Sequence, residues 1–170
     1  DRFVTTGIID SDLARELSLS GTAARATGML LDGRAHRQGY TPPAPYTALG
    51  VRPATDERGD VAARVAVRFD EIFESLRLLR LLAVGMPVGE FLTDVAPVAN
   101  GAGLGVVEGW RGEVVVGVEL DAEGRLARVH PHDPSWQAWP ALEFAVLRDI
   151  VPDFPLINKS FNLSYSGVDL

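Results

Sequence analysis

The chain has 170 residues, of which 46% are hydrophobic and 23% are charged, and its formal net charge is −7. This balance is typical of a folded globular protein, and the length suits one domain over residues 1–170. The negative charge, with no basic cluster to offset it, excludes nucleic acid as a partner, and no apolar run is long enough to cross a bilayer. The sequence contains no cysteine, which excludes disulfides, thiolate nucleophiles and thiolate metal ligands.

The first half of the chain predicts one weak and one strong helix. Residues 11–26 have a weak helical pattern with Ser11 as a candidate N-cap, and residues 32–53 form a long loop rich in Gly and Pro. Residues 59–83 predict a helix of about six turns, which Asp60 begins and Gly85 ends. Its expected apolar face comprises Val61, Val65, Phe69, Ile72, Leu76, Leu79 and Ala83.

The second half predicts a small antiparallel sheet and a further helix. A connector over residues 87–105 leads to β-prone runs at residues 106–108, 113–120 and 125–130, the last two joined by a hairpin loop at residues 121–124. Ser135 is expected to cap a helix that extends through Arg148, and Pro152 and Pro155 prevent this helix from continuing. A tail of mixed composition follows over residues 156–170. The expected fold class is α+β, with one long bundle helix packed against the sheet.

Two patterns that could bind ligands favour ordinary structure instead. The glycine-rich residues 100–105 lead into a strand, whereas phosphate-binding loops open a helix, so a surface loop is expected. His130 and His132 have the spacing of one strand face, but Pro131 separates them and a third ligand is missing. We therefore expect solvated loop histidines and no metal site.

Two polar groupings remain as candidate sites. Asp60, Arg64, Arg68 and Glu71 form a stripe along the long helix, with Arg68 expected on the buried side and Arg77 on the opposite, solvent-facing side. We favour a role of this stripe in anchoring the helix to another helix or subunit over a row of solvent-exposed salt bridges, because a buried guanidinium needs several acceptors. The segment at residues 108–113 holds Arg111 between two glutamates, and a hairpin turn and a functional site explain it equally well.

In this order, several short motifs resemble the large subunits of nickel–iron hydrogenases and of respiratory complex I, including formate hydrogenlyase-type members. The motifs run along almost the whole chain, which places it in the C-terminal part of a longer large subunit. They are Asp1-Arg2 with Thr6-Gly7, Arg25-Ala26-Thr27-Gly28 with Asp32 and Arg34, Gly59-Asp60 with Arg64, Arg68 with Glu74-Ser75-Leu76-Arg77, Arg111-Gly112-Glu113, Asp133-Pro134-Ser135-Trp136, and residues 153–162.

The resemblance also identifies degenerate metal-ligand positions. Hydrogen-activating members end near an Asp-Pro-Cys-x-x-Cys motif, and this chain has Ser164 and Gly167 at the two cysteine positions. Neither residue supplies the soft anionic sulfur that nickel and iron require. Arg111 matches the arginine that overhangs the metal in active members, although Trp110 replaces the preceding proline, so Arg111 is the candidate catalytic residue.

The resemblance implies the C-terminal part of an oxidoreductase large subunit that takes part in electron transfer without a nickel–iron centre. It implies a partner subunit that carries the iron–sulfur clusters, other subunits of a respiratory-type complex, and a peripheral position on the cytoplasmic side of the inner membrane. NAD(P)H and a quinone enter only through the resemblance, and this chain is expected to hold no cofactor. The alternative is a catalytically silent scaffold or interaction module of such a complex.

Overall fold

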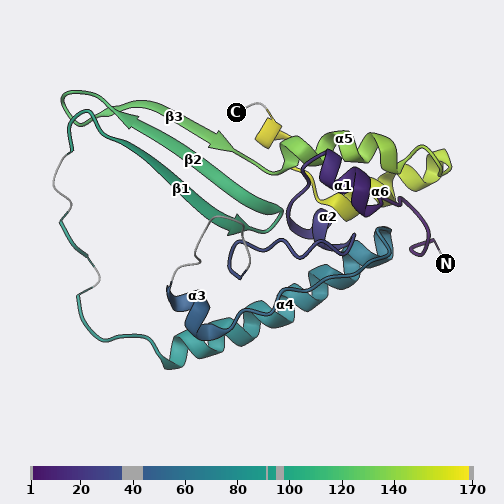
Figure 1. Ribbon diagram of the computed structural model, residues 1–170, viewed down its shortest axis with the longest axis horizontal. Coiled ribbons are helices and arrows are strands. Elements are labelled where there is room, and N and C mark those ends of the chain that lie inside the picture. The colour runs from purple at the N-terminus through teal and green to yellow at the C-terminus, as the bar shows by residue number, and fades with distance from the viewer. Residues whose placement is uncertain (1, 36–43, 91, 95–97, 169–170) are drawn as a thin grey trace.

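The computed structural model describes residues 2–35, 44–90, 92–94 and 98–168 and combines helices with an antiparallel sheet (Figure 1). The α+β fold class is therefore confirmed. The sheet has the strand order β1-β2-β3. The helices are α1 (Ser11–Glu16), α2 (Gly21–Arg25), α3 (Ala44–Leu49), α4 (Val61–Val84), α5 (Ser135–Ala145) and α6 (Phe154–Phe161), the strands are β1 (Ala102–Gly109), β2 (Gly112–Leu120) and β3 (Leu126–His132), and short 3-10 turns lie at Val151–Asp153 and Ser166–Val168.

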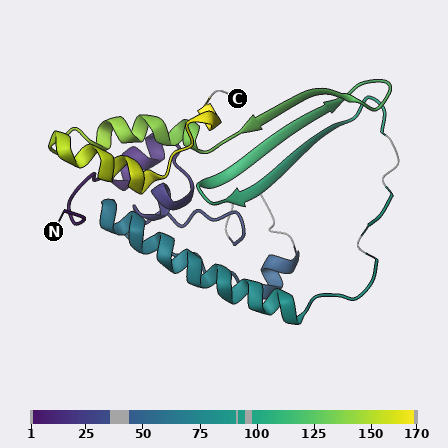
Figure 2. The same ribbon diagram turned by 180° about the vertical axis from the view of Figure 1, so that it is seen from behind.

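The helices gather at one end of the molecule, and two arms extend from them (Figures 1 and 2). Helices α1, α2, α5 and α6 lie on one side of the first half of α4, which contacts α2 and α6, while the second half of α4 and the sheet project away from this body. The main core lies in the helical body and includes Ile9, Leu19, Leu142, Ile157 and Phe161. The fold therefore holds together the chain's two ends, with the sheet and the end of α4 left largely uncovered.

Two short helices replace the single helix predicted over residues 11–26. Backbone φ angles of 54° at Ser18 and 61° at Gly21 turn the chain between them. Asp10, rather than Ser11, caps α1, because its side chain accepts hydrogen bonds from the backbone N–H groups of Asp12 and Leu13. A Cβ atom at Gly21 would lie 2.0 Å from the carbonyl oxygen of Arg111, so glycine allows the β1–β2 turn to lie against α2.

The long helix α4 begins and ends close to the predicted positions, with Asp60 as its N-cap and Gly85 as its C-cap. The side chain of Asp60 accepts a hydrogen bond from the backbone N–H of Ala63 at 2.7 Å. The buried face, however, differs from the predicted apolar face, because Phe69 and Leu79 are 58% and 60% exposed. The residues that α4 buries are Val61, Ala63, Arg64, Val67, Glu71, Glu74 and Leu78.

The sheet confirms the predicted hairpins and corrects two details. Strand β1 begins at Ala102, so most of the glycine-rich segment is strand, with Gly105 opposite Val116 of β2. Pro131 lies within β3 opposite Val116 and is tolerated there because β3 is an edge strand. His130 and His132 are consequently strand residues, and the expectation of a loop was wrong.

Three predictions about the other segments were also wrong. Helix α5 ends at Ala145 instead of Arg148, and Ser135 lies inside it with Pro134 at the N-cap position. Helix α6 occupies the start of the expected tail, and Pro155 lies in its first turn, where proline is well suited. Helix α3 lies within the expected long loop, of which residues 36–43 are outside the described part of the structure.

Candidate functional site

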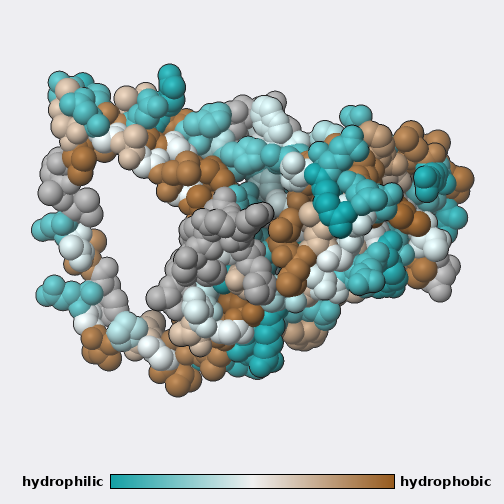
Figure 3. Space-filling view, viewed as in Figure 1, coloured by the Kyte–Doolittle hydropathy of each residue, from teal (hydrophilic) through white to brown (hydrophobic). Residues whose placement is uncertain are grey.

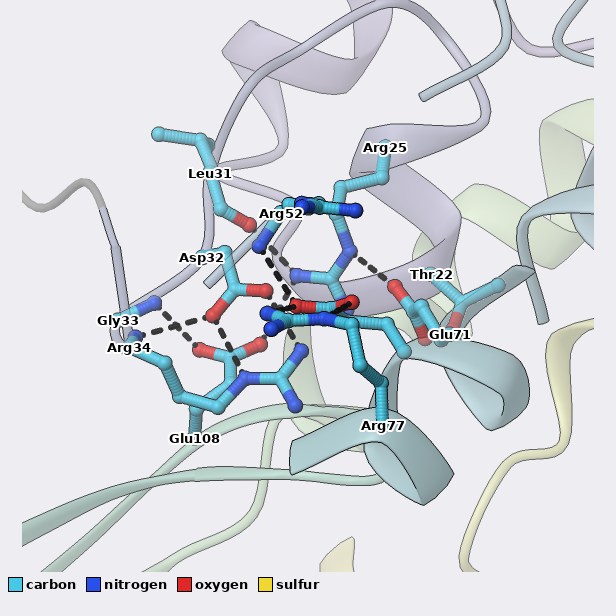
Figure 4. A network of polar contacts seen from close by, with 11 residues as sticks. Thr22, Arg25, Leu31, Asp32, Gly33, Arg34, Arg52, Glu71, Arg77 and Glu108 are labelled. Carbon is cyan, nitrogen blue, oxygen red and sulfur yellow. Dashed lines mark hydrogen bonds and ion pairs between the residues drawn. The ribbon is translucent and has the colours of Figure 1, made fainter. Parts of the chain in front are cut away.

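A buried ion network joins α2, α4 and β1 around Arg25, whose side chain is 1% exposed (Figure 4). Its Nε donates to Glu71 of α4, and its Nη1 donates to the carboxylate of Glu108 of β1 at 2.9 Å and to the carbonyl of Leu31 at 2.6 Å. The hydroxyl of Thr22 adds a longer contact of 3.4 Å to Glu71. One guanidinium thus fixes three segments that are far apart in the sequence.

The charges in this network balance each other. Burial alone would lower the pKa of Arg25, but the carboxylates of Glu71 and Glu108 outweigh burial and raise that pKa above its ordinary value. Burial similarly opposes ionisation of Asp32, yet the hydrogen bonds and charge of Arg34 hold the pKa of Asp32 below its ordinary value. Both shifts favour the charged forms of Arg25 and Asp32, which suits a rigid anchor better than a group that exchanges protons.

A second buried cation, Arg64, lies on α4, and no carboxylate of the described residues is bonded to it. Its side chain donates to the carbonyls of Gly7 at 2.8 Å and Gly59 at 2.7 Å and to the hydroxyl of Ser160 at 2.8 Å. The guanidinium carbon lies 4.2 Å from the ring centroid of Phe161. Burial lowers the pKa of Arg64 to about 9, which still leaves the group charged at neutral pH.

The predicted polar stripe therefore lies against other segments, with its members in different roles. Asp60 accepts backbone hydrogen bonds, Arg64 and Glu71 are buried, and Arg68 is only partly buried. Arg64, and not Arg68, is the deeply buried cation. Arg77 is not free on the solvent side, because it pairs with Glu74 at 2.6 Å.

The two ends of the chain meet beside this stripe. Arg2 forms an ion pair with Asp153, a contact between residues 151 positions apart. The backbone N–H of Gly7 donates to Asp149 at 2.8 Å. The Arg2–Asp153 contact joins two of the resemblance motifs, so motifs from the start and the end of the sequence are structural neighbours.

Arg111 lies at the tight turn between β1 and β2 and reaches the last part of the chain. Its Nε donates to the carbonyl of Asn162, which ends α6 in the left-handed conformation. The guanidinium of Arg68 lies nearby, 6.0 Å from the ring centroid of Trp110. The structure thus brings Arg68 and Arg111 together beside the segment that leads to Ser164 and Gly167.

Ser164 and Gly167 do not fit a nickel–iron centre. The hydroxyl of Ser164 accepts a hydrogen bond from the N–H of Gly167 at 3.1 Å, and the N–H of Ser164 donates to Ser135 at 2.9 Å. A Cβ atom at Gly167 would lie 2.7 Å from the carboxylate carbon of Asp133, so this position has no room for a metal-binding side chain. In the described part of the chain, no three His, Asp or Glu residues are grouped as metal ligands.

An open cavity of about 420 Å³ lies next to the ion network. Its lining combines the apolar side chains of Leu19, Met29 and Leu31 with polar residues. His132 and Gln137 at its rim share a hydrogen bond of 3.0 Å. The polar lining residues are Arg15, Ser18, Ser20, Asp32, Glu108, Glu113, His132 and Gln137.

Sequence reasoning missed Arg25 and Glu108 as members of a buried site. Arg25 sits in a short helix without an apolar pattern, and Glu108 was placed in a segment whose role was left open. Their pairing joins residues 83 positions apart, so no local pattern could have revealed it. The available signal was the isolated charge of Arg25 among small residues, since a cation there needs a distant acid.

These features define a large-subunit-like module whose C-terminal segment lacks thiolate ligands. The chain belongs to the family of the respiratory-chain NADH dehydrogenase 49 Kd subunit, whose sequence profile matches residues 1–99. The predicted membership of the nickel–iron hydrogenase and complex I large-subunit family is thereby confirmed.

Several relatives match nearly the whole chain. The carbon monoxide-induced hydrogenase of Rhodospirillum rubrum is 29% identical over 95% of this chain and 44% of its own length. A subunit of the F(420)H(2) dehydrogenase of Methanosarcina mazei is 30% identical over 99% of this chain and 46% of its own length. Formate hydrogenlyase subunit 5 of Escherichia coli is 27% identical over 99% of this chain and 29% of its own length. The chain therefore spans less than half the length of these relatives.

A solved structure supports the same fold. A chain of the membrane-bound sulfane sulfur reductase, an archaeal respiratory membrane complex, superposes with a TM-score of 0.85 at 26% identity. The match covers 99% of this chain and 47% of that chain. Within the described residues, no helix of this protein is both long and apolar enough to pass through a membrane.

Proposed function

We propose that this chain is part of a large subunit that takes part in electron transfer in a multi-subunit respiratory-type oxidoreductase without a nickel–iron centre of its own. The observation that carries the proposal is the donor set at the C-terminal end, where a hydrogen-bonded serine and a glycine without space for a side chain replace soft ligands. Family membership and the TM-score of 0.85 support the large-subunit fold.

We further propose that iron–sulfur clusters reside in a partner subunit and that the complex lies on the cytoplasmic side of the inner membrane. NAD(P)H as the donor and a quinone as the acceptor are the expectations from the family resemblance. Formate hydrogenlyase subunit 5 and the membrane-bound hydrogenase subunit alpha of Pyrococcus furiosus are relatives named as subunits of larger assemblies, which supports partners of this kind.

Affinity purification of the tagged chain from its own host in mild detergent tests the assembly and its metals. We expect iron to copurify with a cluster-bearing partner, and nickel to be absent at stoichiometric level. Anaerobic reconstitution of the chain alone with iron, nickel and sulfide should give no bound cluster, because carboxylate, hydroxyl and imidazole groups do not replace thiolates. One nickel ion per chain in either preparation contradicts the proposal.

The variant Arg111→Met in the purified complex distinguishes the proposed function from the alternative, a catalytically silent scaffold. If Arg111 takes part in the reaction, the KM for the acceptor or kcat changes while the subunit composition stays the same. A scaffold leaves both kinetic constants unchanged. Arg125→Met is the matched control, because Arg125 is 73% exposed at the β2–β3 turn.

A further inference from the structure

Two arginines converge on a small cavity between α2, α4, α5 and the β1–β2 turn. The cavity has a volume of about 10 Å³, which is room for about one water-sized group. Arg68, Trp110 and Arg111 contribute its charged and aromatic wall, and apolar side chains such as Ala138 and Leu163 close the rest. The cavity is separate from the larger one beside Glu108.

The Nε of Arg68 has no hydrogen-bond partner although it is shielded from solvent, and it is the one such atom found among the buried side-chain nitrogens and oxygens of the described residues. Its Nη2 donates to the carbonyl of Ser160 at 2.9 Å. A buried donor without an acceptor costs free energy, and the cost is larger for a charged group. The position therefore calls for an acceptor from outside the described residues.

Arg111 adds a second positive charge with unused donors. Its Nε is bonded to the carbonyl of Asn162, and its Nη nitrogens have no partner within the described part of the chain. The nearby acid Glu71 is bonded to Arg25 and Thr22 and pairs directly with neither arginine of the cavity. Burial lowers the pKa of Arg68, Glu71 raises it, and the charge of Arg111 lowers it again.

We propose that Arg68 and Arg111 bind one small anion beside the ring of Trp110, through a single group of about the size of a water molecule, such as a chloride ion or one oxygen of a carboxylate. A water molecule would satisfy the Nε of Arg68 but would leave two like charges facing each other. A negative charge satisfies the donor and removes the repulsion, and the planar guanidinium groups suit oxygen anions. The anion is either free in solution or the carboxylate of an acidic side chain of another subunit.

This inference deepens the proposed function by naming what Arg111 holds, and its test measures binding rather than electron transfer. Chloride-35 NMR line broadening is recorded with the full chain while sodium chloride is added, and the identical titration of Arg111→Met accounts for the effect of the rising ionic strength. We expect saturable broadening that formate reverses. In Arg111→Met the apparent affinity should fall at least about tenfold, since a charge-assisted contact is lost.

Two controls keep the result specific. Arg128→Met removes the same charge from a residue that is 73% exposed on β3 and should leave the broadening unchanged. Arg111→Lys retains the charge without the planar fork and should bind with intermediate affinity, which also serves if the Met variant fails to fold. Far-UV circular dichroism establishes that each variant is folded.

The same titration on the purified complex separates the two sources of the anion. Broadening that persists in the complex identifies a free anion as the ligand, and broadening that is lost on assembly identifies a carboxylate from a partner. Either result supports an anion site. Broadening of the chain alone that does not saturate, or that is equal in the parent and in Arg111→Met, overturns the proposal, whatever the activity of the complex.

Discussion

Arg64→Met tests whether a buried guanidinium without a paired acid anchors the fold. The substitution keeps the bulk of the side chain and removes the hydrogen bonds to Gly7, Gly59 and Ser160. Gly59 and Ser160 retain other bonds, to the N–H of Ile9 and to the carbonyl of Ile157. The carbonyl of Gly7 is left without that donor, at a cost of about 1–3 kcal/mol.

Loss of the charged hydrogen bonds adds to this cost, and relief of the buried charge offsets part of it. We therefore expect Arg64→Met to lower the free energy of unfolding by about 3 kcal/mol. Arg68→Met should lower it by less than about 1 kcal/mol, because Arg68 gives up one bond and its unpaired Nε disappears. Arg77 is unsuitable as the neutral control, since it pairs with Glu74, so exposed Arg128 replaces it.

Urea unfolding followed by far-UV circular dichroism measures all three variants against the parent. Arg128→Met should change the free energy of unfolding by no more than about 0.5 kcal/mol. Equal small losses for Arg64→Met and Arg128→Met would show that the buried guanidinium contributes nothing. A larger loss for Arg68→Met than for Arg64→Met would restore Arg68 as the principal anchor.

Three further predictions concern the ion network and the β1–β2 turn. Arg25→Met should lower the free energy of unfolding in urea by about 3–5 kcal/mol, because it leaves the buried carboxylate of Glu71 without its cation. Adding Glu71→Gln removes that unpaired charge and should recover part of the loss. The pKa of Asp32 is lower in the folded protein than in the unfolded chain, so Asp32→Asn should have a lower free energy of unfolding than the parent above about pH 4. This difference should disappear as the pH falls through the lowered pKa, and a difference that does not depend on pH contradicts the prediction. Gly21→Ala should lower the melting temperature, because its Cβ would collide with the β1–β2 turn, whereas Gly103→Ala, which has open space, should not.

The position of α4 could be predicted from the sequence because its signals are local. A carboxylate cap, an uninterrupted period and a terminal glycine all lie within the helix or next to it. The face that it buries could not be predicted, because the partners of Glu71 and Arg64 come from segments 46 and 96 positions away. A charged residue is inexpensive to bury only when such distant partners exist, and periodicity does not reveal them.

Other errors came from residues that serve two purposes. Proline can end one helix and also lie in the first turn of another, so Pro155 was interpreted only as a stop signal although it lies in the first turn of α6. Ser135 has the chemistry of an N-cap, but its hydroxyl accepts from the N–H of Ser164 in the C-terminal segment. The resemblance singles out Ser164 and Gly167, which are hydrogen-bonded to each other, whereas the approach of Arg68 to Arg111 required the folded chain.

Large apolar residues of the face predicted for α4 are exposed in the described structure, since Phe69, Leu76 and Leu79 are 58%, 45% and 60% exposed. Apolar atoms are visible at the free end of α4 (Figure 3). Leu79 is 60% exposed, while its neighbour Leu78 is 5% exposed, so the two leucines form a matched pair. We expect Leu79→Asn to change the stability of the chain alone by no more than about 0.5 kcal/mol and to reduce copurification of partner subunits. Leu78→Asn should cost about 3 kcal/mol in the chain alone, because it places a polar group in the core. If both substitutions destabilise the chain equally, the exposed face of α4 is covered within the chain itself and is no contact for the rest of the complex.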